Sequence, residues 1–166
     1  MKPAMNPNTF KAPWGKTLCW MSAFTAVIIP AVAVPILLKA PVGWLIALIL
    51  PAAALFIVRS YAIEPNVLAI RRLLWTTRLP LAGLQSAELS PNVMRGSLRL
   101  FGNGGMFSIT GLFRNRALGN YRAFVTDLKR TVVLRFPERI IVVSPECPEK
   151  FVAEISRFAF RAAPFP

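Results

Sequence analysis

The sequence contains no histidine and only two cysteines, Cys19 and Cys147, in 166 residues. The lack of histidine removes the commonest general base, the usual zinc ligand and every Ser-His or Cys-His nucleophile pair. Two cysteines do not make a disulfide framework, and their scarcity favours a reduced, cytosolic context. We therefore predict no catalytic residues, no bound metal and no cofactor.

Acidic residues are also scarce: 7 stand against 20 lysines and arginines, for a net charge of +13. Most of the basic residues and all of the acidic ones lie at or after Arg59. A basic region held at a bilayer is attracted to anionic headgroups. Nucleic acid is a rival partner, and a solvated basic surface without a partner is the third interpretation.

Charged residues are absent from two apolar stretches, residues 18–38 and 42–58, which are separated only by Lys39, Ala40 and Pro41. At a rise of about 1.5 Å per residue, the first stretch matches a hydrocarbon core of about 30 Å, and the second is near the lower limit for a span. Prolines inside them are tolerated in membrane helices. The pattern predicts a two-helix transmembrane hairpin over residues 18–58. The tryptophans near its ends suit the membrane interface: Trp14, Trp20 and Trp44.

Two other interpretations of this region stay open. A cleaved signal peptide would also have a lysine-containing leader and small residues such as those at 31–33. The second apolar stretch would then remain as a membrane span. The other interpretation is a helical hairpin buried in a globular core.

Basic residues flank the predicted hairpin on both sides, whereas its turn holds only Lys39. By the positive-inside rule, both termini and the C-terminal region face the cytoplasm and the turn lies outside. Residues 1–17 are then a cytoplasmic tail, and the protein is a multi-pass protein of the bacterial cytoplasmic (inner) membrane. The flanking residues are Lys2, Lys11, Lys16, Arg59, Arg71 and Arg72.

Beyond Arg59 the sequence changes to short β-type segments broken by turns such as Pro65-Asn66. Many short strands with few helices between them predict an antiparallel sandwich or barrel, a mainly β (α+β) fold. The expected strands are residues 61–64, 67–72, 74–79, 85–90, 98–101, 107–112, 121–127, 131–136 and 139–144.

The last element is predicted to be an amphipathic helix that begins at Pro148, a residue suited to the first helical position. Glu149 in the first turn and Arg157 and Arg161 in the last complement the helix dipole. Strands followed by one such helix are what a roll plugged at one end requires. The apolar face consists of Phe151, Val152, Ile155, Phe158 and Ala159.

Several runs in this region resemble those of bacterial PH-like domain proteins, namely residues 98–105, 111–113, 119–127 and 142–152. The resemblance implies a PH-like roll over residues 59–163 with a short tail at 164–166, and the double membrane span before it fits members of the family. It implies fold and location, but no activity. Cys147 departs from the pattern, because an aspartate cap would be more usual there.

The glycine-rich run at residues 102–105 suggests a phosphate-binding loop, because glycines let backbone N–H groups converge on an anion. No Gly-Lys-Ser/Thr follows, and the next segment is a predicted strand instead of a helix. We therefore favour a glycine hairpin with positive φ angles.

Arginines cluster near the tether and around the glycine-rich run. They are candidates for one face that contacts an anionic phospholipid or an acidic partner, although strand alternation places adjacent ones on opposite faces. Non-specific apposition to the bilayer and a solvated surface remain alternatives. These residues are Arg71, Arg72, Arg78, Arg95, Arg99, Arg114, Arg116 and Arg122.

The carboxylates are scattered, and we assign them to salt links and turns. Asp127 ends a predicted strand, so we interpret it as a turn cap. The aromatic residues among the strands are interpreted as core residues: Phe101, Phe107, Phe113, Tyr121 and Phe124.

These patterns favour a non-enzymatic membrane protein whose PH-like domain binds a protein partner, a second copy of itself or the anionic lipid surface. The alternative is an enzyme, or an enzyme subunit, that acts on a membrane substrate. That alternative requires a pocket in which Arg99, Asp127 and residues 102–105 converge. A membrane-bound nucleic-acid binder is a third hypothesis, supported by basicity alone.

Overall fold

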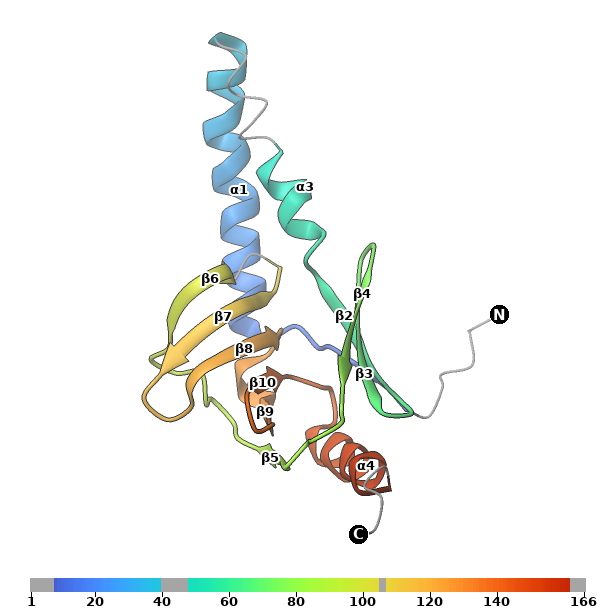
Figure 1. Cartoon of the computed structure of the whole chain (residues 1–166). Coiled ribbons are helices and arrows are strands. Elements are labelled where there is room, and N and C mark those ends of the chain that lie inside the picture. The colour runs from blue at the N-terminus through green and yellow to red at the C-terminus, as the bar shows by residue number, and fades with distance from the viewer. Residues whose placement is uncertain (1–7, 40–47, 105–106, 162–166) are drawn as a thin grey trace, which may run out of the picture.

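The computed structural model describes residues 8–39, 48–104 and 107–161. A long helix, α1 (Lys16–Lys39), and a short one, α3 (Ile49–Ala54), extend from one end of a strand-rich domain (Figure 1). The helix α1 has 24 residues and so measures about 36 Å. Within the described residues it is the one helix long and apolar enough to cross a membrane. The first predicted apolar stretch is therefore a helix.

The second predicted apolar stretch is a helix only in part. Its residues 42–47 lie outside the described part of the chain, and α3 ends at Ala54. The prediction of one helical span reaching residue 58 is wrong at its C-terminal end, because Val58 opens strand β2 (Val58–Glu64) and is fully buried in the core.

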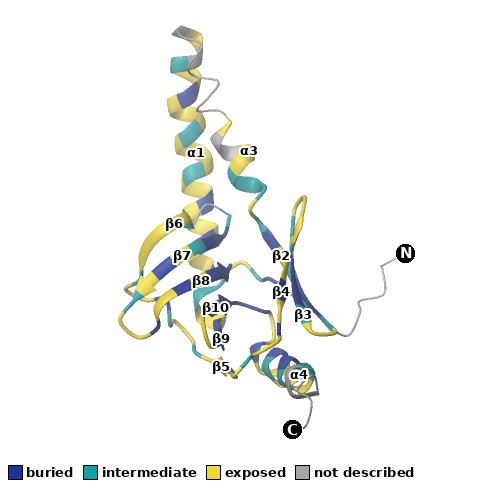
Figure 2. Ribbon diagram, viewed as in Figure 1, coloured by how far each residue is buried: buried dark blue, intermediate teal, exposed yellow. Residues whose placement is uncertain are grey.

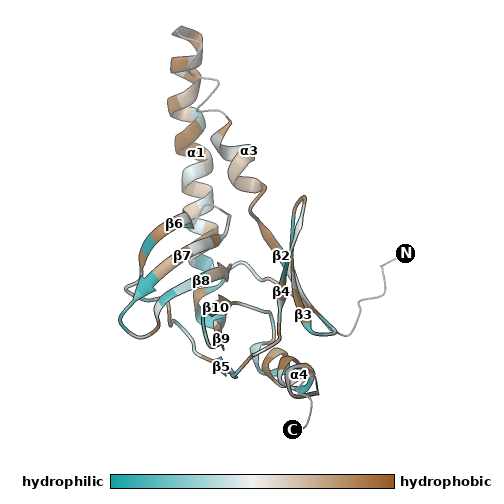
Figure 3. Cartoon of the chain, viewed as in Figure 1, coloured by the Kyte–Doolittle hydropathy of each residue, from teal (hydrophilic) through white to brown (hydrophobic). Residues whose placement is uncertain are grey.

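The first turns of α1 pack against the domain. Leu18 is buried, and the Ser22 hydroxyl accepts a hydrogen bond from the Phe107 N–H at 2.9 Å. Farther along the helix, large apolar side chains such as Phe24 and Val27 are exposed. Figure 3 shows this exposed length of α1 as largely apolar. The first turns of α1 therefore pack on the domain, whereas the helix beyond them exposes apolar side chains.

One sheet has four antiparallel strands in the order β1-β2-β3-β4. Its members are β1 (Thr9–Lys11), β2, β3 (Val67–Arg72) and β4 (Thr76–Pro80). The expected turn between β2 and β3 is confirmed, with Asn66 at a φ of 60°. The prediction that residues 1–17 are a tail is wrong for β1, because the Ala12 N–H donates to the Arg59 carbonyl oxygen at 3.0 Å and Thr9 pairs with Ala62.

The other sheet has six strands in the order β5-β9-β10-β8-β7-β6. It consists of β5 (Ser86–Leu89), β6 (Leu98–Gly104), β7 (Ile109–Asn115), β8 (Gly119–Val125), β9 (Val132–Arg135) and β10 (Ile140–Val143). The prediction of an antiparallel fold is wrong at one pair. The strand β10 folds back on β9 and inserts between β9 and β8, so it runs parallel to β8.

Two apolar clusters lie on opposite faces of the six-stranded sheet. Phe124 and Ile141 face the four-stranded sheet and the C-terminal helix α4 (Pro148–Arg161), whereas Ala123 and Val142 face the base of α1. This alternation is the period of two of a β-strand. Figure 2 shows buried residues in the strands of both sheets and on the inner face of α4.

Helix α4 closes one end of the space between the sheets, as the amphipathic pattern predicts. Phe151 and Ile155 are fully buried, and the Phe151 ring meets the Phe10 ring edge-on at 5.3 Å. Pro148 is its first residue, as expected. The mostly β architecture with its C-terminal helix is consistent with a PH-like barrel.

Candidate functional site

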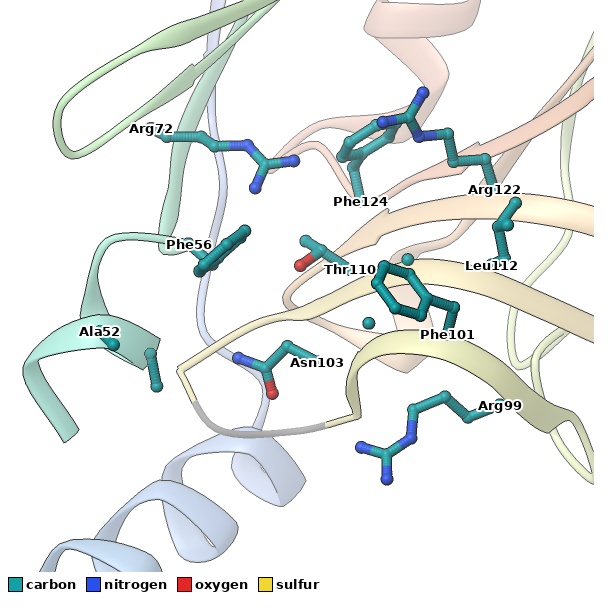
Figure 4. Close-up of a pocket in the computed structure, with 13 residues that line it drawn as sticks. Ala52, Phe56, Arg72, Arg99, Phe101, Asn103, Thr110, Leu112, Arg122 and Phe124 are labelled. Atoms are coloured by element: carbon teal, nitrogen blue, oxygen red, sulfur yellow. The ribbon is translucent and has the colours of Figure 1, made fainter. Parts of the chain in front are cut away.

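A cavity of about 780 Å³ opens between α3 and the strands β3, β6, β7 and β8. Three arginines line it, and each comes from a different strand: Arg72 from β3, Arg99 from β6 and Arg122 from β8 (Figure 4). The remaining wall is mainly apolar. It includes Ala52, Ala53, Phe56, Phe101, Leu112 and Phe124.

Arg72 is the most enclosed of the three arginines. Its guanidinium carbon lies 5.3 Å from the ring centroid of Phe124, 5.4 Å from Trp75 and 5.6 Å from Phe56. Its Nε atom is buried and has no hydrogen-bond partner among the described residues. Burial lowers the pKa of Arg72, and the neighbouring Arg122 guanidinium lowers that pKa further. Among the described residues, the Arg72 cation is thus contacted by aromatic rings and by no carboxylate.

Arg122 reaches the same aromatic ring from β8. Its guanidinium carbon lies 5.2 Å from the Phe124 centroid, and the side chain is otherwise exposed. Arg122 and Phe124 are two residues apart on one strand, so they share a face. Figure 4 shows Arg72 and Arg122 both reaching toward Phe124. Two positive charges therefore converge on one ring.

Glycines bring β6 and β7 together at the edge of the cavity. Gly102 and Gly111 face each other with φ angles of 110° and 143°, which favour glycine. A Cβ on Gly111 would lie 2.8 Å from the Gly102 Cα, so neither position accepts a side chain without a backbone shift. The strand that follows this run is confirmed, and residues 102–104 belong to β6 itself. Residue 105 lies outside the described residues.

The other predicted arginines lie elsewhere. Arg114 and Arg116 line a second hollow of about 430 Å³ near the β7–β8 turn. Arg71, Arg78 and Arg95 are exposed, the first two on the four-stranded sheet and the third between β5 and β6. The structure thus brings three of the eight predicted arginines together in one cavity.

Asp127 does not line the cavity. Its Oδ1 atom accepts a hydrogen bond from the Lys129 N–H at 3.0 Å at the start of a short 3₁₀ turn, η1 (Leu128–Arg130), and its Oδ2 atom lies 3.6 Å from Arg130 Nε. The interpretation of Asp127 as a turn cap is confirmed. Among the described residues, Arg99 and Gly102 line the cavity and Asp127 does not, so these residues do not form the convergence on which the enzyme hypothesis was based. Among the described residues, no group of three His, Cys, Asp or Glu side chains forms a metal site.

The sequence offered a signal for the enclosed arginine that the prediction did not use. Arg72 follows Leu68 and Ile70 at intervals of two, and both of these are fully buried. The same alternation places Arg72 on the inner face and Arg71 on the outer one. Phe101 was interpreted as a core residue, but its side chain is 75% exposed and lines the cavity.

Exposed apolar side chains surround this end of the domain. Leu73, Leu74 and Trp75 form the β3–β4 turn, and Leu100 and Phe101 lie on β6. In Figure 1 this turn and β6 lie toward the end from which α1 and α3 extend. The cavity therefore opens at the helix-bearing, apolar end of the domain.

Comparison with protein families matches residues 59–158 to the family described as Bacterial PH domain. The match begins at β2 and ends within α4, so it covers both sheets except β1. No curated protein and no solved structure matched the chain. The matched segment makes up more than half of the sequence, and the chain belongs to the bacterial PH domain family.

Proposed function

We propose that this protein is a two-span protein of the bacterial cytoplasmic membrane that holds its PH-like domain against the inner leaflet as a non-enzymatic binding module. The observation that carries the proposal is the pairing of β1 with β2. These strands lie on either side of the apolar region in the sequence, yet they are neighbours in one sheet.

This pairing constrains how the apolar region crosses a bilayer. Because Ala12 and Arg59 are hydrogen-bonded, the chain that leaves the domain in α1 returns to the same place. If α1 crosses the membrane, the returning segment must cross it as well. A single crossing would separate β1 from β2 by the thickness of the bilayer, about 30 Å. The pairing therefore supports a hairpin with both ends on one side.

The charges that flank the hairpin support a cytoplasmic domain. Lys11, Lys16 and Arg59 lie where the chain enters and leaves the domain, whereas Lys39 is the last residue of α1, at the end of the helix away from the domain. Basic flanks are retained on the cytoplasmic side of bacterial membranes. The net positive charge of the domain is then presented to the anionic inner leaflet.

The surface of the domain supports binding more than catalysis. The described lining of the cavity has three arginines but no carboxylate, cysteine or histidine that would act as an acid, base or nucleophile. The strand β6 lies at an edge of its sheet, and Leu98 and Leu100 on it are largely exposed. An open apolar edge of this kind suits a protein partner or a second copy of the chain.

The enzyme-subunit alternative has one observation in its favour, which is that Arg99 and Gly102 both line the cavity. In that role the domain would hold a phosphorylated membrane substrate for a catalytic partner. It is the second choice because the described lining residues include no acid or base.

The two cysteines provide a direct test of the topology. Cys147 is exposed next to α4, and Cys19 is exposed on α1. In a Cys19→Ser variant, a membrane-impermeant maleimide should label Cys147 in inverted membrane vesicles and not in intact spheroplasts. A cysteine-free chain carrying Ala40→Cys should give the opposite pattern. Labelling of Cys147 in intact spheroplasts would contradict the proposal.

The interaction role is tested by the oligomeric state in mild detergent. Light scattering of the wild-type chain should give a mass above that of one copy. If the partner is another protein, gentle extraction should recover a stable complex. Leu100→Lys on β6 should disrupt that assembly, whereas Arg95→Lys, an exposed change off the strand, should not. A strictly monomeric chain without partners would count against this role.

A further inference from the structure

We propose that the cavity between α3 and the strands β3, β6, β7 and β8 binds the phosphate group of an anionic phospholipid, with Arg72 and Arg122 as its ligands. The proposal deepens the proposed function and rests on it, because a domain held at the inner leaflet brings this cavity to the lipid.

The charges in the cavity are unbalanced. Three arginines line it, and no carboxylate appears in its described lining. The two ion pairs found within the described residues, Arg130–Asp127 and Arg157–Glu154, involve other parts of the domain. Among the described residues, no carboxylate pairs with any of the three arginines. An anionic ligand would supply the negative charge that the described lining lacks.

Arg72 adds a specific unmet hydrogen bond. Its Nε–H is buried and lacks a partner within the described residues, and a buried donor without an acceptor destabilises the protein. The three aromatic rings around the guanidinium stabilise its charge but accept no conventional hydrogen bond. An oxyanion in the cavity would supply an acceptor for the Arg72 guanidinium, and the buried Nε–H would reach it by a rotation of the side chain.

The geometry suits a phosphate group. The guanidinium carbons of Arg72 and Arg122 lie 5.3 and 5.2 Å from the centroid of the same Phe124 ring, and both side chains line the cavity. A phosphate diester has one negative charge shared by two oxygens, and these oxygens accept forked N–H donors from arginines. Its negative charge would also relieve the repulsion between the two guanidinium groups.

The apolar walls point to an amphiphile. Phe56, Phe101 and Leu112 border the charged region, and Ala52 and Ala53 of α3 leave space beside it. At about 780 Å³ the cavity is in the range of ligand sites, about 300–1,000 Å³, and is far larger than a free phosphate needs. A phosphate attached to acyl chains fits both the charge and the walls.

Binding is tested with the full chain purified in an uncharged maltoside detergent. Native mass spectrometry would count bound dihexanoyl phosphatidylglycerol, and a titration would give its dissociation constant. We expect one saturable lipid per chain. We expect at least tenfold weaker binding of dihexanoyl phosphatidylcholine, whose ammonium group would face the arginines, and of inorganic phosphate.

Variants connect binding to the cavity. Arg122→Gln and Arg72→Gln should each weaken phosphatidylglycerol binding at least tenfold. Arg78→Gln removes the same charge from an exposed position on β4 and should change binding less than twofold. Arg122 is exposed, so its variant reports on binding even if Arg72→Gln does not fold.

Each other outcome overturns a stated part of the proposal. If Arg78→Gln weakened phosphatidylglycerol binding as much as Arg122→Gln does, the attraction would be non-specific. If phosphatidylcholine bound as tightly as phosphatidylglycerol, the site would not select a lipid with a net negative charge. Equal binding of inorganic phosphate would exclude the lipid. Cysteine labelling of the wild-type chain separates the two proposals. A wild-type chain that binds no phosphatidylglycerol but keeps Cys147 on the cytoplasmic side overturns the lipid site alone.

Discussion

Phe124 lies between two regions of the domain that satisfy their polar groups in different ways. On the side of the α4 plug, the Tyr61 hydroxyl donates to the Phe124 carbonyl oxygen at 2.6 Å and accepts from the Ser144 N–H at 3.3 Å. The Ser144 hydroxyl accepts from the Thr126 N–H at 2.8 Å. On the cavity side, the ring of Phe124 meets Arg72, whose buried Nε–H has no described partner.

The difference separates a region that stabilises the fold from one suited to a ligand. We call the hydrogen-bonded group of Tyr61, Thr126 and Ser144 the closed region. There, burial raises the pKa of Tyr61 to about 12, although its hydrogen bonds to Ser144 act in the opposite direction. The phenol is therefore neutral and partnered at physiological pH. In the open region, which is the cavity lined by Arg72 and Arg122, the Arg72 guanidinium is partly desolvated and has no counter-ion among the described residues. We expect changes in the first region to reduce stability and changes in the second to affect binding.

The largest effect is expected at the plug. Phe151→Ala removes a fully buried ring from the core and should lower the free energy of unfolding by about 3–5 kcal/mol. Arg157→Ala, on the exposed face of α4, should cost less than about 0.5 kcal/mol. Denaturant unfolding of the full chain in detergent measures both. A loss below about 1 kcal/mol for Phe151→Ala would mean that α4 is not a plug.

Alkaline pH should loosen the closed region next. The pKa of Tyr61 is about 12 in the folded state against 10 unfolded, so its contribution is complete below pH 10 and declines as pH rises through 12. By pH 12 the loss should reach about 2 kcal/mol.

The matched control for this pH effect is Tyr61→Phe, which should remove this part of the pH dependence. Burial also raises the pKa of Tyr121, and that contribution should remain in the variant. Unfolding titrations at pH 9 and 12 compare the two chains. The same pH dependence in both would contradict the role given to Tyr61.

A smaller loss is expected at the turn that follows the closed region. Asp127→Ala removes the side chain that accepts from the Lys129 N–H and should cost about 1 kcal/mol. Asp127→Asn keeps an acceptor and should recover most of that loss. Because Asp127 does not line the cavity, phosphatidylglycerol binding should be unchanged in both variants. Weakened phosphatidylglycerol binding would mean that the turn at Asp127 contributes to the binding site as well as to stability.

The smallest effect, and the only one of opposite sign, is expected in the open region. Arg72→Met replaces a partly desolvated cation with an apolar side chain of similar length, so without lipid it should raise the free energy of unfolding by up to about 1 kcal/mol. Added phosphatidylglycerol should stabilise the wild type and not the variant. A loss above about 1 kcal/mol in lipid-free detergent would assign Arg72 to the fold.

Local patterns predicted the elements that depend on neighbouring residues. The turn at Asn66, the start of α4 at Pro148 and the burial of Phe151 and Ile155 follow from backbone preference and helical periodicity. The long helix α1 follows from uninterrupted apolar composition. Each of these signals lies within one turn or one segment of the chain.

Pairings between distant segments were not predicted. The union of β1 with β2 joins residues about 50 positions apart, and nothing local to Thr9 marks it as a strand of that sheet. The parallel pair β8–β10 arises because β10 inserts beside β8 after folding back on β9. Strand alternation also assigns inner and outer faces, but it does not say which strands meet across a cavity.

Composition and periodicity predicted the apolar tether, the basic strand-rich region and the helix that closes it, because they report what each segment must bury. The PH-like class was implied by the resemblance of short runs to a known family. The sheet topology, in contrast, places Arg72, Arg99 and Arg122 around one cavity and leaves Asp127 outside it. Their three strands are brought together by sheet topology, and the charge of a site is the sum over side chains that the chain order keeps apart.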